Sequence, residues 1–165
     1  MEKIIIKFPD GRDKEFEKGV TPYQIALSVS ERLANDALAA KVNGYVLDMH
    51  RPINHDADIR FLMFEDEEGK EVYWHSSSHL MAHAIKSLYP EAKFGVGPAI
   101  ENGFYYDFDI NTKLDDEHLR KIEDRMEKLS KDDNKFERSE LSKEKAIDFF
   151  KKQDDQYKLE ILNEL

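Results

Sequence analysis

Strand, turn and helix signals follow one another closely in the first 64 residues, and few folds can satisfy their order. Apolar residues alternate with other residues at Ile4, Ile6 and Phe8. A Pro9-Asp10-Gly11 turn follows, and Lys14–Glu17 resumes the extended pattern. Alternation with a period of two is typical of a half-buried strand, and Pro and Gly between two such runs indicate a turn. This part of the sequence therefore predicts a β-hairpin.

A strong helix start follows the predicted hairpin. Thr21 is placed as the N-cap, Pro22 at the first helical position and Gln24 at the capping-box position. Apolar residues then recur at helical spacing, at Ile25, Ala26, Val29 and Leu33. Three further strand-like segments follow, the first two joined by an Asn43-Gly44 turn: Ala39–Val42, Tyr45–Leu47 and Ile59–Phe64. The order of these elements, with one helix on a sheet, predicts a β-grasp (ubiquitin-like) fold over residues 1–64.

A second domain is predicted over residues 65–165, which makes the whole chain an α+β protein. The charged stretch Glu65–Glu71 reads as a solvated connecting loop. Helices are expected at Trp74–Leu88, ended by Pro90, after Asp115 with the packing stripe Leu119, Ile122, Met126 and Leu129, and after Ser142. Strands are expected at Phe94–Val96, Phe104–Ile110 and Phe136–Leu141. The apolar pattern of Tyr157–Leu162 needs a packing partner, which suggests a larger domain cut short.

Composition limits the possible partners and compartments. The chain has no cysteine, so neither a disulfide framework nor a thiolate metal site can form within it. It has no run of about 18 apolar residues that could span a membrane and no signal peptide, so a cytoplasmic protein fits best. The net charge of −10 argues against tight autonomous binding to nucleic acid, because phosphate contacts require a basic surface.

Three histidines four residues apart are the leading chemical candidates. His75, His79 and His83 fall on the predicted helix 74–88, where residues at i and i+4 are neighbours. One interpretation is structural, with His75 capping the helix and His79 filling a polar gap. A catalytic zinc site would need a third ligand, which His83 could supply only awkwardly, and the glutamate of H-E-x-x-H is absent. Acid/base chemistry on water is the more economical hypothesis, because imidazole titrates near neutral pH.

The other candidates are ambiguous from their patterns alone. Ser76–Ser78 lack a Gly-x-Ser-x-Gly elbow, so capping or solvated serines are favoured over a nucleophile. The turn at Gly97 could bring backbone amides close to a ligand. Tyr105 and Tyr106 would face opposite sides of a strand, so at most one points at the histidines. Lys158 alone would be a surface ion pair.

Several motifs resemble known families. The segments PDGR, GVTPYQIA, LAAKVNG and RPINHDADIRFL resemble the TGS domain, a β-grasp module of threonyl-tRNA synthetases and of some regulatory GTPases and stringent-response proteins. The segments HSSSHLMAHAI, FGVGPAIENGFYYDFD and DDQYKLEIL resemble the editing domain that follows TGS in bacterial threonyl-tRNA synthetases. Together these motifs cover essentially the whole chain in the order found in that family.

This resemblance implies hydrolysis of serine that has been wrongly attached to threonine tRNA. Serine lacks one methyl group of threonine, and such a difference gives only about 1–3 kcal/mol of discrimination, so a second site must remove the error. His75 and His79 match the HxxxH pair of the family, which would position or activate water. Lys158 matches a lysine near the substrate. Gly97 and Tyr106 match positions that line the pocket for the terminal adenosine and the seryl group.

The resemblance also implies an N-terminal piece of a longer enzyme. The family completes its editing site with a later cysteine- and histidine-containing motif that this sequence lacks. No cofactor is expected here; ATP, magnesium and zinc belong to a synthetase domain. The expected partner is the acceptor end of tRNA(Thr), held weakly, and the parent is expected to be a homodimer through other domains. The alternatives are a non-catalytic ubiquitin-like TGS binding module with a helical appendage, and a free-standing trans-editing hydrolase.

Overall fold

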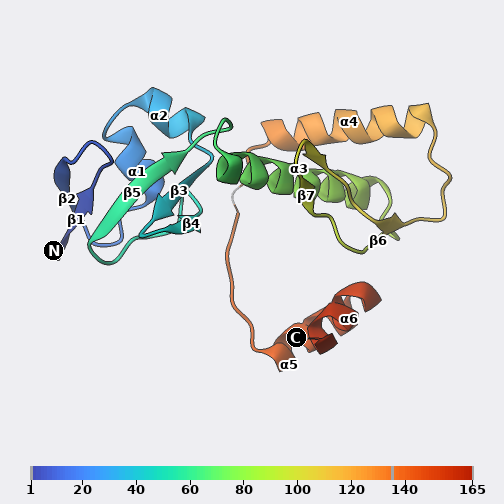
Figure 1. The fold of residues 1–165 in the computed structure, drawn as a ribbon. Helices are drawn as coiled ribbons and strands as arrows, with labels where there is room; N and C mark the ends of the chain where they lie inside the picture. The colour runs from blue at the N-terminus through green and yellow to red at the C-terminus, as the bar shows by residue number, and fades with distance from the viewer. Residues whose placement is uncertain (1, 135, 165) are drawn as a thin grey trace. The chain divides into compact units, whose positions relative to one another are not determined.

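The computed structural model describes residues 2–134 and 136–164. It divides into two compact units, Met1–Tyr73 (unit 1) and Trp74–Leu165 (unit 2), which are described separately below (Figure 1). The division falls inside one helix, α3 (Glu67–Leu88). The domain boundary predicted after residue 64 stays a prediction.

Unit 1 is built on a five-stranded mixed sheet. Its strands, in spatial order, are β2 (Asp13–Glu17), β1 (Lys3–Lys7), β5 (Ala57–Leu62), β3 (Ala39–Val42) and β4 (Tyr45–Leu47). Strand β1 pairs antiparallel with β2 and parallel with β5, and β3 pairs antiparallel with both β4 and β5. Helices α1 (Pro22–Leu27) and α2 (Glu31–Asp36) lie on one face of this sheet (Figure 1). The predicted α+β class with a β-grasp unit is confirmed.

The local signals of unit 1 act as the sequence predicts. Thr21 caps α1 in a complete capping box with Gln24, and Pro22 is the first helical residue. Asn43 and Gly44 have positive φ angles of 49° and 85°, as a tight turn between β3 and β4 requires. The side chains sealed between sheet and helices include the fully buried Ile6 and Ile25.

The single helix expected after Thr21 is in fact two. The break lies at Ser28–Ser30, because serine side chains bond locally to the backbone and compete with a continuous helix. The Ser28 hydroxyl donates to the carbonyl of Ile25 at 2.8 Å, which ends α1. The Ser30 side chain accepts from the amide of Leu33 at 3.1 Å, which starts α2.

The prediction of a loop over the charged stretch Glu65–Glu71 is wrong for most of its length, because α3 begins at Glu67. Acidic residues in the first turn of a helix interact favourably with the helix dipole. Glu68 also pairs with Lys41 of β3 at 2.6 Å. Gly69 lets the helix lie directly on the backbone of Met63, where an added Cβ would stand 2.0 Å from the carbonyl oxygen.

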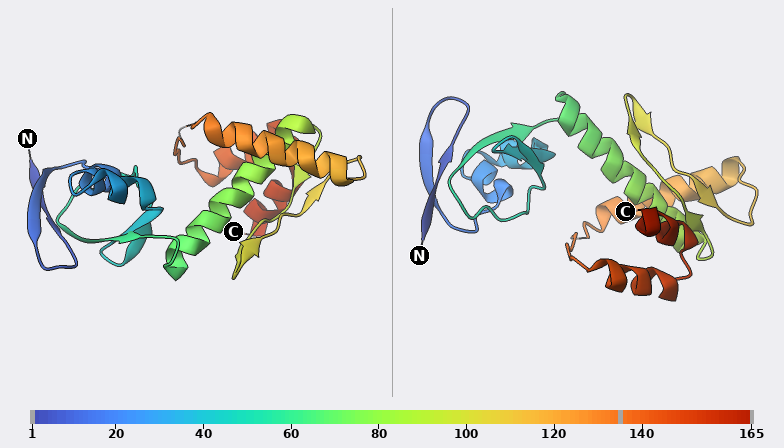
Figure 2. Two further views of the ribbon diagram at one scale, coloured as in Figure 1. Left: turned by 90° about the horizontal axis from the view of Figure 1, so that it is seen from above. Right: turned by 60° about the horizontal axis from the view of Figure 1, so that its bottom comes forward.

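In the described residues of unit 2, three helices follow α3, together with four very short strands. The helices are α4 (Asp116–Lys131), α5 (Lys143–Lys152) and α6 (Gln156–Glu164). The strands are β6 (Lys93–Phe94), β7 (Ala99–Ile100), β8 (Gly103–Phe104) and β9 (Phe108–Asp109), paired β6 with β9 and β7 with β8. Figure 2 shows α4 beside the second half of α3, and the buried side chains Ala84, Ile85, Ile122 and Leu129 belong to one apolar cluster.

Three sequence-based expectations for unit 2 need correction. The strands expected at Phe94–Val96 and Phe104–Ile110 are reduced to pieces of two residues. Residues 136–141 form no strand and have no partner strand, and Phe136 is 89% exposed. Leu119 leaves the predicted packing stripe of α4 and is 54% exposed. The caps Asp115 and Ser142 are confirmed.

No helix among the described residues is long and apolar enough to cross a membrane.

Candidate active site

The helix α3 brings His75 and His79 into direct contact. Their Nε2 atoms are 2.9 Å apart and their ring centroids 4.7 Å apart. This confirms that the two imidazoles are neighbours, as the spacing of four residues predicts. Both residues are exposed to solvent, so the pair can meet a ligand or water.

The surroundings of the pair favour neutral imidazole. Partial burial lowers the pKa of His79 below its usual 6.5, and the charges of His75 and Lys158 lower it further. Although His79 as a residue is exposed, the protein around its ring displaces enough water to make desolvation the largest cause. A neutral ring nitrogen near neutral pH is the form that can accept a proton from water.

Ser78 is a fully buried polar residue between the two histidines in sequence. Its hydroxyl oxygen lies 2.8 Å from the carbonyl of His75 and 3.1 Å from the carbonyl of Gly97. The single hydroxyl proton is therefore directed at one or the other acceptor, which ties α3 to the Gly97 segment. From the sequence, Ser78 was interpreted as a capping or solvated serine. Its position three residues after His75, on the inner face of α3, was the signal that could have identified it as a buried residue.

Gly97 and Tyr106 are in close contact. A Cβ added at Gly97 would lie 2.3 Å from Cδ2 of the Tyr106 ring, so only glycine fits there without a shift. Phe94 also contacts the Tyr106 ring edge-on, with centroids 5.6 Å apart. Burial, and then the charge of Asp155, raise the pKa of the Tyr106 hydroxyl, so this group stays protonated and able to donate a hydrogen bond. Tyr105, by contrast, is exposed.

Lys158 reaches the same region from α6. Its Nζ donates to the carbonyl of Gly95 at 3.2 Å, two residues before Gly97. The Asp155 side chain accepts from the backbone amide of Lys158 at 3.1 Å and so fixes the first turn of α6. The isolated ion pair suggested by the sequence is replaced by a half-buried ammonium group on a backbone carbonyl, close enough to His79 to lower its pKa.

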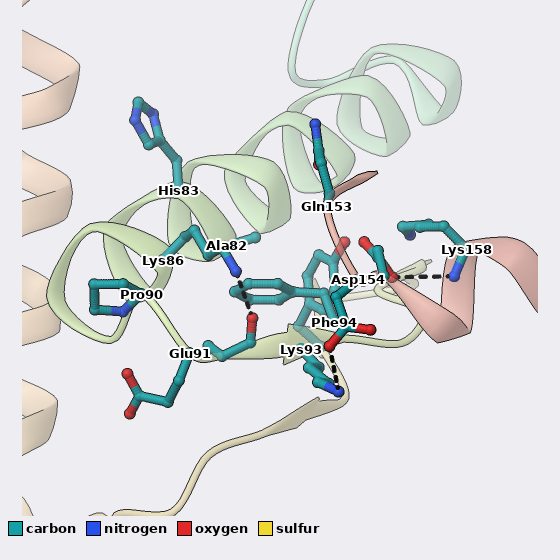
Figure 3. Close-up of a pocket in the computed structure, with 13 residues that line it drawn as sticks. Ala82, His83, Lys86, Pro90, Glu91, Lys93, Phe94, Gln153, Asp154 and Lys158 are labelled. Carbon is teal, nitrogen blue, oxygen red and sulfur yellow. Dashed lines mark hydrogen bonds and ion pairs between the residues drawn. The ribbon is translucent and has the colours of Figure 1, made fainter. Parts of the chain in front are cut away.

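A cavity of about 760 Å³ opens beside these residues (Figure 3). Its wall includes Tyr106, Lys158, Phe94 and His83. His75 and His79 are not among the described residues that line it. Lys158 and Tyr106 thus line the cavity, and the charge of Lys158 lowers the pKa of His79. The two paired imidazole rings are not part of the cavity wall.

Part of the chain matches a family model, and the whole chain is similar to known proteins. Residues 4–63 match the family model of the TGS domain. These residues form a TGS domain. The chain is also similar throughout to the N-terminal region of proteins named threonine–tRNA ligase. It is 46% identical over 165 residues to the ligase of Caldanaerobacter subterraneus subsp. tengcongensis and 50% identical over 164 residues to that of Porphyromonas gingivalis.

The chain spans about a quarter of the length of these relatives. It covers 26% of the Caldanaerobacter ligase, 25% of the Porphyromonas ligase and 26% of the ligase of Clostridioides difficile, to which it is 47% identical. The matched TGS domain ends before α3. All five candidate site residues therefore follow the TGS domain: His75, His79, Gly97, Tyr106 and Lys158.

Among residues 2–134 and 136–164, no group of three or more His, Asp or Glu side chains is arranged to hold a metal ion. His83 lies on the cavity wall, away from the contact between His75 and His79. The side chains of this region after the TGS domain are thus two imidazoles in contact, an ammonium group whose charge reaches one of them, and a protonated phenol on the cavity wall. Such a set can bind water, accept a proton and stabilise developing negative charge.

Proposed function

We propose that this chain is the N-terminal region of a threonine–tRNA ligase, and that residues 74–165 contribute the site that hydrolyses serine from mischarged seryl-tRNA(Thr). The observation that carries this proposal is the contact between His75 and His79 at 2.9 Å, on the solvent-exposed face of a helix and within electrostatic reach of Lys158. The similarity over the whole chain to ligases that must distinguish threonine from serine supports it.

The proposed chemistry uses each group according to its charge. A neutral imidazole of the pair accepts a proton from water, and the resulting hydroxide attacks the carbonyl carbon of the seryl ester. The ammonium group of Lys158 stabilises negative charge on the carbonyl oxygen. The bond to the ribose oxygen then breaks, and the imidazolium returns its proton to this leaving oxygen. Free serine and uncharged tRNA result.

The close contact between Gly97 and Tyr106 gives the site a means of excluding threonine. A Cβ at Gly97 would overlap the Tyr106 ring, so the segment has no spare space of methyl size at that point. If the seryl side chain is held against this contact, the extra methyl group of threonine has no free space to enter. Since one methyl group gives about 1–3 kcal/mol in a single site, this second selection would multiply the first one.

The other partners follow from the proposed parent. The acceptor end of tRNA(Thr) would bring the seryl ester to the site, whereas ATP, magnesium and zinc would be used by a synthetase domain and are assigned to no residue here. A cytoplasmic location and a homodimer formed through other domains fit the same parent. With a net charge of −10, the 165-residue chain should bind free tRNA more weakly than micromolar at physiological salt. A tighter measured Kd would contradict the proposal that other parts of the parent enzyme hold the tRNA.

Deacylation of seryl-tRNA(Thr) by the full-length ligase tests the proposal. Replacing His75 and His79 together by alanine should slow hydrolysis by about 10²–10⁴-fold, the usual contribution of general acid–base groups, and should leave threonine attachment unchanged. His83→Ala is the matched control, since it removes a histidine from the same helix outside the pair. An unchanged rate in the double variant would refute the editing role.

A second candidate is a non-catalytic TGS binding module with a helical appendage. The specific observation that favours it is the match of residues 4–63 to the TGS family, since the TGS domain contains none of the candidate catalytic residues. The deacylation experiment separates the two, because a binding module predicts that neither the histidine pair nor Lys158 affects hydrolysis.

A further inference from the structure

We propose that His75 and His79 work as one base that takes up a single proton, rather than as two independent groups. This inference rests on the proposed function, because it assigns the proton-accepting step to the pair. It is based on the direct contact of the two Nε2 atoms and on the positions of the ring protons that this contact requires.

A separation of 2.9 Å between two ring nitrogens is a hydrogen-bond distance. Two bare nitrogens would repel through their lone pairs, so one Nε2 must carry a proton and the other must accept it. In the neutral pair, the donor ring holds its only proton on Nε2, which leaves its Nδ1 bare. The acceptor ring holds its proton on Nδ1. The pair therefore presents one bare nitrogen to its surroundings, whichever histidine is the donor.

The first proton enters at that bare Nδ1. An O–H bond of water breaks, an N–H bond forms at Nδ1 of the donor ring, and the hydroxide oxygen bonds to the ester carbonyl carbon. The existing Nε2–H···Nε2 bond then becomes an imidazolium–imidazole bond, and such charge-assisted bonds are about twice as strong as neutral ones. The partner ring stabilises the new charge without receiving a second proton. When the ester bond breaks, the same proton passes to the ribose oxygen.

Charged groups on two helices, α3 and α6, disfavour the binding of a second proton to the pair. It would require two imidazolium rings with centroids 4.7 Å apart on α3. Lys158, on α6, adds a third positive charge whose influence reaches His79. Besides burial, these two neighbours, His75 and Lys158, are what lower the pKa of His79. Two strongly interacting groups lose and gain protons in two separated steps, so the pair stops at one proton over the working range.

His83 provides the control that the chain itself offers. It lies four residues after His79 on the same helix and lines the neighbouring cavity. It is also exposed, like the paired rings. A general effect of histidine substitution on α3 should appear equally at His83, whereas proton sharing should not.

A nitrogen-15 NMR titration of the 165-residue chain tests the inference without any substrate. In the unsubstituted chain, His75 and His79 should each respond to both steps of a two-step titration. In His75→Gln, His79 should titrate in a single step whose pKa lies between the two steps of the pair, because the stabilising bond to a neutral ring and the repulsion from a charged ring are both gone. His83→Gln should leave both signals unchanged. If His79 titrates identically with and without His75, the inference is wrong, whatever the activity of the parent.

Kinetics of the full-length ligase give the second test. If the two rings act as one base, His75→Gln, His79→Gln and the double variant should lose seryl-tRNA hydrolysis by about the same factor, as groups that act as a unit do. Losses that multiply would show two independent groups; the shared base would then fail while the editing function stands. No loss in any variant would reject the editing function and the shared base together.

Discussion

Unit 1 and unit 2 bury their apolar side chains very differently. Among the described residues, twelve buried side chains form the core between the sheet and helices of unit 1. The corresponding cluster in unit 2 has five. Unit 1 has one continuous five-stranded sheet, whereas the paired strands of unit 2 are two residues long. Stability is therefore concentrated in unit 1, and all the candidate chemistry lies in the less consolidated unit 2.

The difference teaches that the site depends on individual contacts rather than on a large core. Three bonds from different segments converge around it: the His75–His79 contact, Ser78 to the Gly97 carbonyl, and Lys158 to the Gly95 carbonyl. Regions with fewer buried contacts open more readily and are more sensitive to local changes. Substitutions of matched type in the two units should thus affect different properties.

Core truncation should give the largest effect, and it should be greater in unit 1. Ile25→Ala removes a side chain that is completely buried against the sheet, which costs about 2–5 kcal/mol of the free energy of unfolding. Ile122→Ala in the smaller cluster of unit 2 should lie at the low end of this range, because a sparse cluster can relax into the space. Denaturation followed by amide NMR signals of each unit measures both values. A larger loss for Ile122→Ala would reverse the comparison.

Crowding at Gly97 should be the next largest effect and should act mainly on activity. In Gly97→Ala, the new Cβ forces the Tyr106 ring aside, and a displacement of about 1 Å can cost about 100-fold in rate. Overpacking should also destabilise unit 2 by about 1–3 kcal/mol. The matched control is Gly95→Ala, whose Cβ would lie 3.3 Å from the nearest atom, a side-chain carbon of Asp107. Comparable losses of seryl-tRNA hydrolysis in both variants would contradict a specific role for Gly97.

The same contrast explains how much could be predicted from the sequence. In unit 1 the turn at Asn43-Gly44 and the cap at Thr21 are local signals, and they led to the correct fold. The break at Ser28–Ser30 was missed, because the apolar spacing of one long helix continues across it.

Unit 2 shows the limit of such signals. A strand was expected at Phe136–Leu141, but a strand also needs a partner strand, and the sequence of one segment does not supply it. At the site, the spacing of His75 and His79 was enough to predict their contact. The place of Ser78 and the link from Lys158 to Gly95 join residues 19 and 63 positions apart, so only the folded chain reveals them.

Helix caps offer a smaller comparison between the units. Replacing Thr21 and Gln24 together by alanine removes both bonds of a capping box, with lengths of 3.0 and 3.3 Å, and should destabilise unit 1 by about 1 kcal/mol. Ser142→Ala removes one bond of 3.4 Å from α5, so its effect should be at most half as large. Thermal unfolding of each variant, followed by circular dichroism, gives the two values. Equal effects would mean that the second capping-box bond contributes nothing measurable.

The smallest expected effect is a pH dependence confined to unit 2. The pKa of His79 in the folded chain lies below its usual 6.5, so the unfolded chain binds more protons between these two values. The contribution of His79 to stability is therefore complete above about pH 6.5 and is lost as the pH falls toward the folded pKa. Because His79 is exposed, solvent screening keeps the change small. Hydrogen exchange of α3 amides at several pH values measures it, with His83→Gln as control. The slope should disappear in His79→Gln and persist in the control; a slope that survives in both would assign the pH dependence to other groups and remove the electrostatic distinction between the two units.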